Sequence, residues 1–114
     1  MNKLAAAFEH EMASARALYL HGAYDSAFYH LERAHILGQK HLIRHWRSHW
    51  WMLKVGLRRH DGREIRGQLL RLVATLPGYV FGWVPVGNTG GANVSAIKPM
   101  PIPADLQAIL DTGK

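Results

Sequence analysis

Hydrophobic residues recur every three to four positions along the first two thirds of the chain, which is the spacing of one face of a helix. This pattern predicts four helices, and a fifth short helix begins after Pro103. Their approximate bounds are residues 3–20, 24–37, 40–60, 63–76 and 104–110. We therefore predict one all-α domain, residues 1–114, built from two antiparallel helical hairpins.

The segment between the fourth and fifth helices has a different composition. Residues 77–103 begin with Pro77-Gly78, which is expected to end the fourth helix, and they continue with aromatic residues, glycines and prolines. Several large apolar groups and few charges argue against disorder. We expect an extended tail that wraps the helical bundle and covers part of its apolar surface. The Gly87–Ser95 loop within it lacks the lysine of a phosphate-binding loop.

Each predicted helix has an apolar arc that we expect to face the core. In the third helix this arc contains Leu42, Ile43, Trp46, Trp50 and Leu53. In the fourth helix it contains Ile65, Leu69, Leu72, Val73 and Leu76. In the first helix the arc also contains an acidic residue, Glu11, which needs a partner because an unpaired buried charge is costly. An arginine of another helix and a metal ion are both open as that partner.

The first hairpin resembles a known repeat. Gly22-x-Tyr24-x-x-Ala27, followed by Leu31, Ala34 and Leu37, is similar to the second helix of a tetratricopeptide repeat. The resemblance covers about residues 11–38. It implies two closely packed antiparallel helices, and hairpins of this family often bind peptides.

Residues 30–49 contain five of the eight histidines and carry the candidate chemistry. They include a Glu32-x-x-His35 pair and a ladder of His41, His45 and His49 at intervals of four residues. Neighbours four apart on a helix are stacked about 6 Å apart on one face. If the chain folds back at Gly38, Glu32, His35 and His45 converge between the second and third helices.

This convergence predicts a metal site, with His41, His49 and Glu11 as further candidate ligands. Imidazole and carboxylate ligands suit zinc, iron, nickel or manganese, and the absence of cysteine argues against copper(I). Glu-x-x-His beside a lone glutamate resembles half of a di-iron bundle motif, but the fourth helix supplies no histidine for the other half. No separate general base indicates an enzyme. Hydrogen-bonded structural histidines are the alternative.

The net charge of +6 is concentrated between Lys40 and Arg71. A basic groove for an acidic peptide or protein is the second functional hypothesis, with four arginines as its candidates: Arg44, Arg47, Arg58 and Arg59. Interleaved tryptophans make nucleic acid a third hypothesis, although a solvated helical face has the same composition. No apolar run is long enough to span a membrane, and Glu9 interrupts the apolar N-terminal run. We therefore expect a soluble cytoplasmic protein, of an oligomeric state that the sequence leaves open.

Taken over nearly its full length, the chain also resembles a small bacterial family of unknown function. The matching stretches are residues 7–11 (AFEHE), 30–39 (HLERAHILGQ), 49–53 (HWWML) and the Gly87–Ser95 loop. This resemblance implies no activity.

Overall fold

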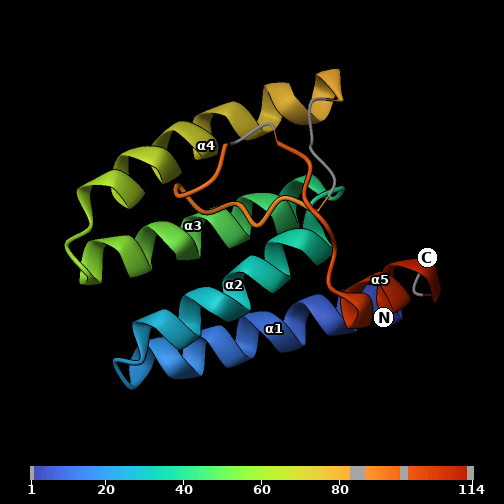
Figure 1. The fold of residues 1–114 in the computed structure, drawn as a ribbon, viewed down its shortest axis with the longest axis horizontal. Coiled ribbons are helices and arrows are strands. Elements are labelled where there is room, and N and C mark those ends of the chain that lie inside the picture. The colour runs from blue at the N-terminus through green and yellow to red at the C-terminus, as the bar shows by residue number, and fades with distance from the viewer. Residues whose placement is uncertain (1, 83–86, 96–97, 113–114) are drawn as a thin grey trace.

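The computed structural model describes residues 2–82, 87–95 and 98–112, and five helices make up most of them (Figure 1). The helices are α1 (Lys3–Leu20), α2 (Tyr24–Gly38), α3 (Leu42–Arg58), α4 (Gly62–Phe81) and α5 (Ala104–Thr112). The described residues contain no strand, so the all-α class is confirmed. Of the predicted tail, residues 83–86 and 96–97 lie outside the described residues.

Each of the first three helices packs against the next one along the chain, and α5 packs against α1 and α2 close to the N-terminus (Figure 1). The core that joins α1, α2, α3 and α5 is apolar, and its fully buried large side chains include Phe8, Leu31, Met52 and Leu106. Full burial of one such side chain contributes roughly 1.5–3 kcal/mol. The tetratricopeptide relationship of the first hairpin stays a prediction.

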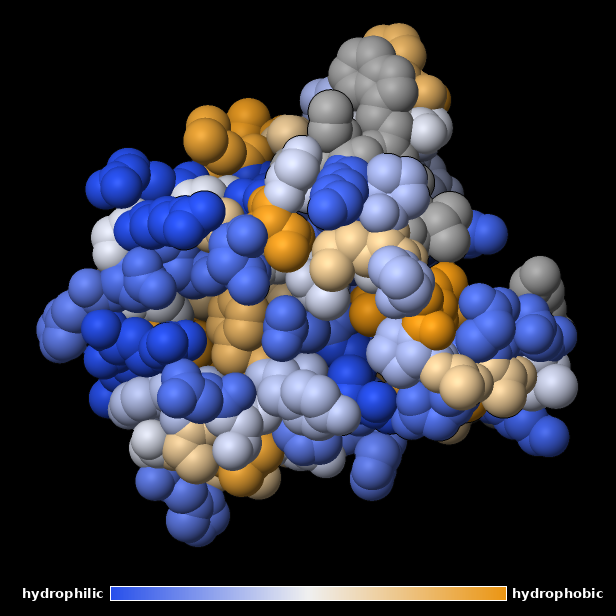
Figure 2. All heavy atoms as spheres, in the orientation of Figure 1, coloured by the Kyte–Doolittle hydropathy of each residue, from blue (hydrophilic) through white to orange (hydrophobic). Residues whose placement is uncertain are grey.

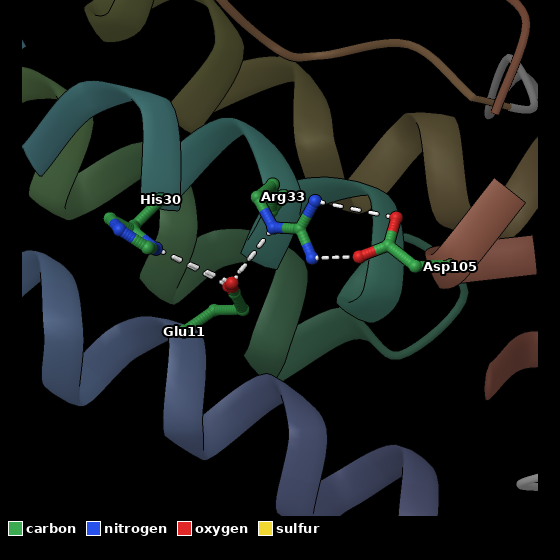
Figure 3. A network of polar contacts seen from close by, with 4 residues as sticks. All are labelled: Glu11, His30, Arg33 and Asp105. Carbon is green, nitrogen blue, oxygen red and sulfur yellow. Dashed lines mark hydrogen bonds and ion pairs between the residues drawn. The ribbon is translucent and has the colours of Figure 1, made fainter. Parts of the chain in front are cut away.

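A partly buried ion-pair network ties α1 to α2 and α5 (Figure 3). The Glu11 carboxylate accepts a hydrogen bond from Arg33 Nε at 2.8 Å, and His30 Nδ1 lies 3.3 Å from the same oxygen. The other end of the Arg33 guanidinium binds Asp105 of α5. Glu11 is 6% exposed, so it lies in the buried arc as predicted, and its partner is an arginine of the neighbouring helix. Such a network fixes the relative position of the three helices, because displacing one partner would strand a buried charge.

The fourth helix does not end at Pro77-Gly78, as the sequence predicted. It continues through Pro77 to Phe81 and is capped by Gly82, whose N–H donates to the Gly78 carbonyl. Proline removes one helical hydrogen bond. The carbonyl left without that bond belongs to Val73, which is 79% exposed, so water can satisfy it. At 20 residues α4 is the longest helix, yet no described helix combines the length and apolarity needed to span a membrane.

The predicted inward faces of α3 and α4 are largely wrong. Ile43, Trp46 and Trp50 of α3 are 40–60% exposed, whereas His45, Ser48 and His49 are buried. In α4 three residues of the predicted inward arc, Leu69, Val73 and Leu76, are exposed, and the buried residues are polar: Glu64, Gln68 and Thr75. Periodicity identified the arcs of both helices, but it assigned the wrong arc to the interior. The reason is that the space between α2, α3 and α4 is filled by polar groups that bond to one another.

Candidate metal centre

Three histidines from α2 and α3 meet in the interior of the bundle. Their ring centroids form a nearly equilateral triangle, with separations of 4.7 Å for His35–His45, 4.7 Å for His35–His49 and 4.8 Å for His45–His49. His49 Nε2 lies 3.2 Å from His35 Nε2 and 3.1 Å from His45 Nε2. All three residues are buried, with exposed fractions of 2%, 7% and 3% in chain order. Among the described residues, these three histidines are the group of side chains whose ligand atoms lie close enough together to hold a metal ion.

Local structure explains why these rings meet. His45 and His49 are four residues apart and therefore share one face of α3. His35 comes from the last turn of α2, and residues 39–41 reverse the chain between the two helices. The reversal is tight at Gly38, where an added Cβ would lie 2.8 Å from Arg44 Cβ and from the Phe8 ring. A glycine at this position lets the start of α3 approach the end of α2.

Hydrogen bonds on the far side of two rings fix their tautomers. His35 Nδ1 lies 2.7 Å from the backbone carbonyl of Asn88, which can only accept, so Nδ1 carries the proton. His49 Nδ1 lies 2.7 Å from Gln68 Oε1. The Gln68 amide is itself oriented, since its Nε2 donates to Glu64 Oε2 at 2.7 Å and to the Gly90 carbonyl at 2.8 Å. His49 Nδ1 must therefore be a donor as well.

With both Nδ1 atoms protonated, the Nε2 atoms of neutral His35 and His49 carry lone pairs that face each other. His45 Nδ1 has no hydrogen-bond partner in the described structure, so this ring can place its proton on Nε2 and donate it to His49. Even then, no proton lies between His35 and His49 at 3.2 Å. An electrophile at the centre of the triangle would remove this conflict.

A proton is a poor candidate for that electrophile near neutral pH. Burial lowers the pKa of His45 to about 4. Burial, reinforced by His45, lowers the pKa of His49 to about 3. For His35, burial and the two other imidazoles bring the pKa well below its ordinary value. The neutral rings are therefore favoured, and neutral imidazole is the form that binds a metal.

The loop that follows α4 closes the site. Besides the Asn88 and Gly90 carbonyls, it supplies the Ala92 N–H, which donates to Glu64 Oε2 at 2.9 Å. The Asn88 side chain holds the loop in shape by bonding to the Gly90 N–H and to the carbonyls of Ser95 and Lys98. Partners of this kind on the outer nitrogen of a ligand histidine are typical of metal sites, where they orient the ring.

Comparison with known families identifies one matching model, described as "Protein of unknown function (DUF3703)", over residues 2–110. The chain belongs to the DUF3703 family. Neither the curated proteins nor the solved structures contain a match to it.

Two further predicted ligands of this DUF3703 chain lie outside the histidine triangle. Glu11 is bound by Arg33 and His30, as described above. His41 is exposed and serves as the N-cap of α3, where its Nδ1 accepts from the Arg44 N–H at 3.3 Å. His41 therefore belongs to the ladder in sequence but not to the cluster in space.

Glu32 is half-buried next to the site and is not one of the three converging groups. Burial raises the pKa of its carboxyl, the nearby Thr89 hydroxyl acts in the opposite direction, and the Glu64 carboxylate adds to the increase. The sequence predicted that Glu32 would converge with His35 and His45, whereas in the structure His49 is the third member of the cluster. Glu32 and His35 are only three residues apart on α2, but Glu32 points toward Thr89 whereas His35 points toward α3.

Three of the four arginines predicted to bind an acidic partner contact groups of the chain itself. Arg47 binds Glu9, Arg59 binds Asp25 at 3.2 Å, and Arg58 donates to the Tyr19 hydroxyl at 3.1 Å. Arg44 lies partly buried at the start of α3. The partner hypothesis for the DUF3703 chain therefore gains no support from these contacts.

Sequence reasoning missed the residues around the ligands. Gln68, Asn88 and Glu64 orient the imidazoles or the loop, and Gly90 packs directly on the His35 ring. A signal for the first group was available, because Glu64 and Gln68 lie four residues apart on a helix with apolar residues elsewhere. Nothing in the sequence connects Asn88 to His35, since 53 residues separate them.

Gly90→Ala is expected to disturb the site of this DUF3703 protein more than a simple loop substitution would. Gly90 has φ +85°, and an added Cβ would lie 2.6 Å from His35 Cδ2 and 2.8 Å from its Nε2. We expect a loss of stability of at least about 2 kcal/mol and, in protein loaded with a metal at the triangle, a lower metal content.

Gly22→Ala is the matched control for this substitution. It has a similar φ of +77° but nothing within 4 Å of the new Cβ, so it tests backbone strain alone. Urea unfolding and metal analysis of both variants check the prediction. Equal effects in the two variants would show that contact with His35 is unimportant.

Proposed function

We propose that this protein binds one divalent transition-metal ion through the Nε2 atoms of His35, His45 and His49. The observation that carries the proposal is the pair of fixed tautomers, which directs two lone pairs at each other across 3.2 Å inside the protein. A bound cation turns this repulsion into two coordinate bonds. The same cation would also be coordinated by the Nε2 atom of His45.

The spacing of the nitrogens supports this proposal. Metal–nitrogen bonds of about 2.0–2.1 Å give nitrogen separations of about 2.8–3.0 Å at right angles and about 3.3–3.4 Å at the tetrahedral angle. The two separations to His49, 3.2 and 3.1 Å, lie between these limits. An all-imidazole set suits zinc, nickel, iron and copper(II), whereas manganese prefers the carboxylate ligands that the triangle lacks.

A metal at this position would have a structural role and stabilise the fold. It would join α2 to α3 directly, and through His35 and His49 it would strengthen the bonds to Asn88 and Gln68. The loop and α4 are held by the same polar groups rather than by a large apolar core. Binding energy at the triangle would therefore contribute to folding.

Elemental analysis of the untagged full-length protein tests the proposal. A polyhistidine tag must be avoided because it carries metal itself. After purification without chelators we expect close to one equivalent of zinc, nickel, iron or copper per chain. Removing the metal and titrating with Zn²⁺ or Ni²⁺ should restore one equivalent. Protein that carries no metal and fails to bind either added ion would refute the proposal.

A further inference from the structure

The outward face of α4 is apolar over three turns. Seven large apolar side chains between positions 69 and 81 are each 47–79% exposed: Leu69, Leu70, Val73, Leu76, Tyr79, Val80 and Phe81. We call this set the α4 face. Figure 2 shows hydrophobic groups along the upper edge of the molecule, where α4 runs in Figure 1.

The exposure of the α4 face follows from the candidate metal centre. Glu64 and Gln68 bond with the loop and with His49, and Thr75, about two turns further along the helix, is also buried, so the polar side of α4 turns inward. Because the helix is apolar on its other side, that side turns outward. A helix in this orientation exposes its apolar side on the surface of the monomer.

The spacing within the α4 face points to another helix as its partner. Leu69, Val73, Leu76 and Val80 are separated by four, three and four residues, the repeat by which two helices interlock their side chains. From Leu72 to Phe81 the sequence contains no charged residue. An acidic or anionic partner therefore finds no complementary charge here, whereas an identical helix offers a matching apolar stripe.

The size of the α4 face also fits a partner of this kind. An aromatic side chain offers about 150–250 Å² and a leucine or valine somewhat less, so the seven partly exposed residues present on the order of 700 Å² in total. The largest apolar patch on an ordinary monomer is about 300–600 Å². A stable interface buries about 800 Å² on each partner.

We infer that two copies of this chain associate through their α4 faces to form a homodimer with two-fold symmetry. A two-fold axis places the same stripe on both sides of the contact, so each copy covers the other's exposed residues. The inference does not require a bound metal, since it depends on the orientation of α4 alone.

Light scattering coupled to size exclusion tests the dimer with the full-length protein as purified. At tens of micromolar we expect twice the chain mass of 12.8 kDa. Val73→Glu should give the monomer mass and weaken association at least 100-fold, because two carboxylates would be buried opposite each other. Leu20→Glu is the matched control: Leu20 is 76% exposed at the end of α1, and its substitution should leave the dimer intact.

A cysteine variant keeps the inference testable if Val73→Glu fails to fold. The chain has no cysteine, so Val73→Cys carries a single thiol. A short bismaleimide reagent should then link two copies of Val73→Cys but not two copies of Leu20→Cys. Added salt should not dissociate the dimer, because the α4 face lacks charge.

Two results would overturn the dimer. One is a wild-type protein that stays monomeric up to 100 µM by light scattering and does not cross-link at position 73. The other is a dimer that Val73→Glu and Leu20→Glu leave equally intact. In the first case, binding of the monomer to anionic vesicles through Val73 would assign the face to a membrane surface.

Discussion

His49→Ala is expected to weaken Zn²⁺ binding by at least about 100-fold relative to the wild-type protein. The Nε2 atom of His49 lies 3.2 Å from that of His35 and 3.1 Å from that of His45, and Gln68 holds the His49 ring with its Nδ1 as the donor. Its removal leaves two of the three proposed ligands. Loss of an orienting partner alone commonly reduces metal affinity 10–100-fold, so the loss of a ligand should cost at least as much. Competition titration with a coloured chelator measures the affinity.

His41→Ala is the control for this experiment. It removes another histidine of the same ladder, but His41 is exposed and caps α3 outside the triangle. The variant should keep wild-type affinity and lose about 1 kcal/mol of stability with the cap. Circular dichroism of both variants shows whether the fold is retained. Equal loss of Zn²⁺ affinity in the two variants would contradict the assignment of the ligands.

Acid should destabilise the metal-free protein well above the range in which ordinary carboxylates titrate. Burial lowers the folded-state pKa of His45 to about 4 and, with help from His45, that of His49 to about 3, whereas an unfolded histidine titrates near 6.5. The unfolded chain therefore binds more protons between these values. Stability is fully present above about pH 6.5 and falls as the pH decreases toward 4 and 3. For His45, which is 7% exposed, the loss amounts to about 3 kcal/mol.

Urea unfolding of chelator-treated protein between pH 7.5 and pH 5 isolates this effect. Glu9 and Asp105 have lowered pKa values and contribute only at more acidic pH. Glu32 acts in the opposite direction, because its raised pKa makes the folded state bind a proton first. His49→Gln should reduce the slope of stability against pH. A stability that is constant over this range would show that the triangle is not buried in its neutral form.

Much of the candidate site was accessible from local sequence. The intervals of four residues put His45 and His49 on one face of α3, and Gly38 indicated the reversal that brings His35 opposite them. The place of Glu32 was not accessible in this way. Its direction depends on Thr89 and Glu64, which are 57 and 32 residues away along the chain. Spacing along one helix fixes which residues share a face, but it does not say what that face meets.

The same limit explains the errors in α3 and α4. Hydrophobic periodicity predicts an inward apolar arc on the assumption that the interior is apolar. Here the histidine triangle, the Gln68 amide and the Glu64 carboxylate occupy the space beside α2. The polar arcs of both helices therefore turn inward. Pro77 was misjudged for a related reason. Its missing hydrogen bond is inexpensive where the helix faces water.

By itself, the sequence determined the five helices, the turn at Gly38, the buried position of Glu11 and the common face of His45 and His49, because each depends on residues close together in the chain. The tertiary structure decided the rest. It selected His49 rather than Glu32 as the third member of the cluster, and it recruited Asn88, Gly90 and Gln68 around it. It also turned the α4 face outward. These outcomes depend on which distant groups satisfy buried hydrogen bonds, and a pattern read along one helix contains no information about its partners.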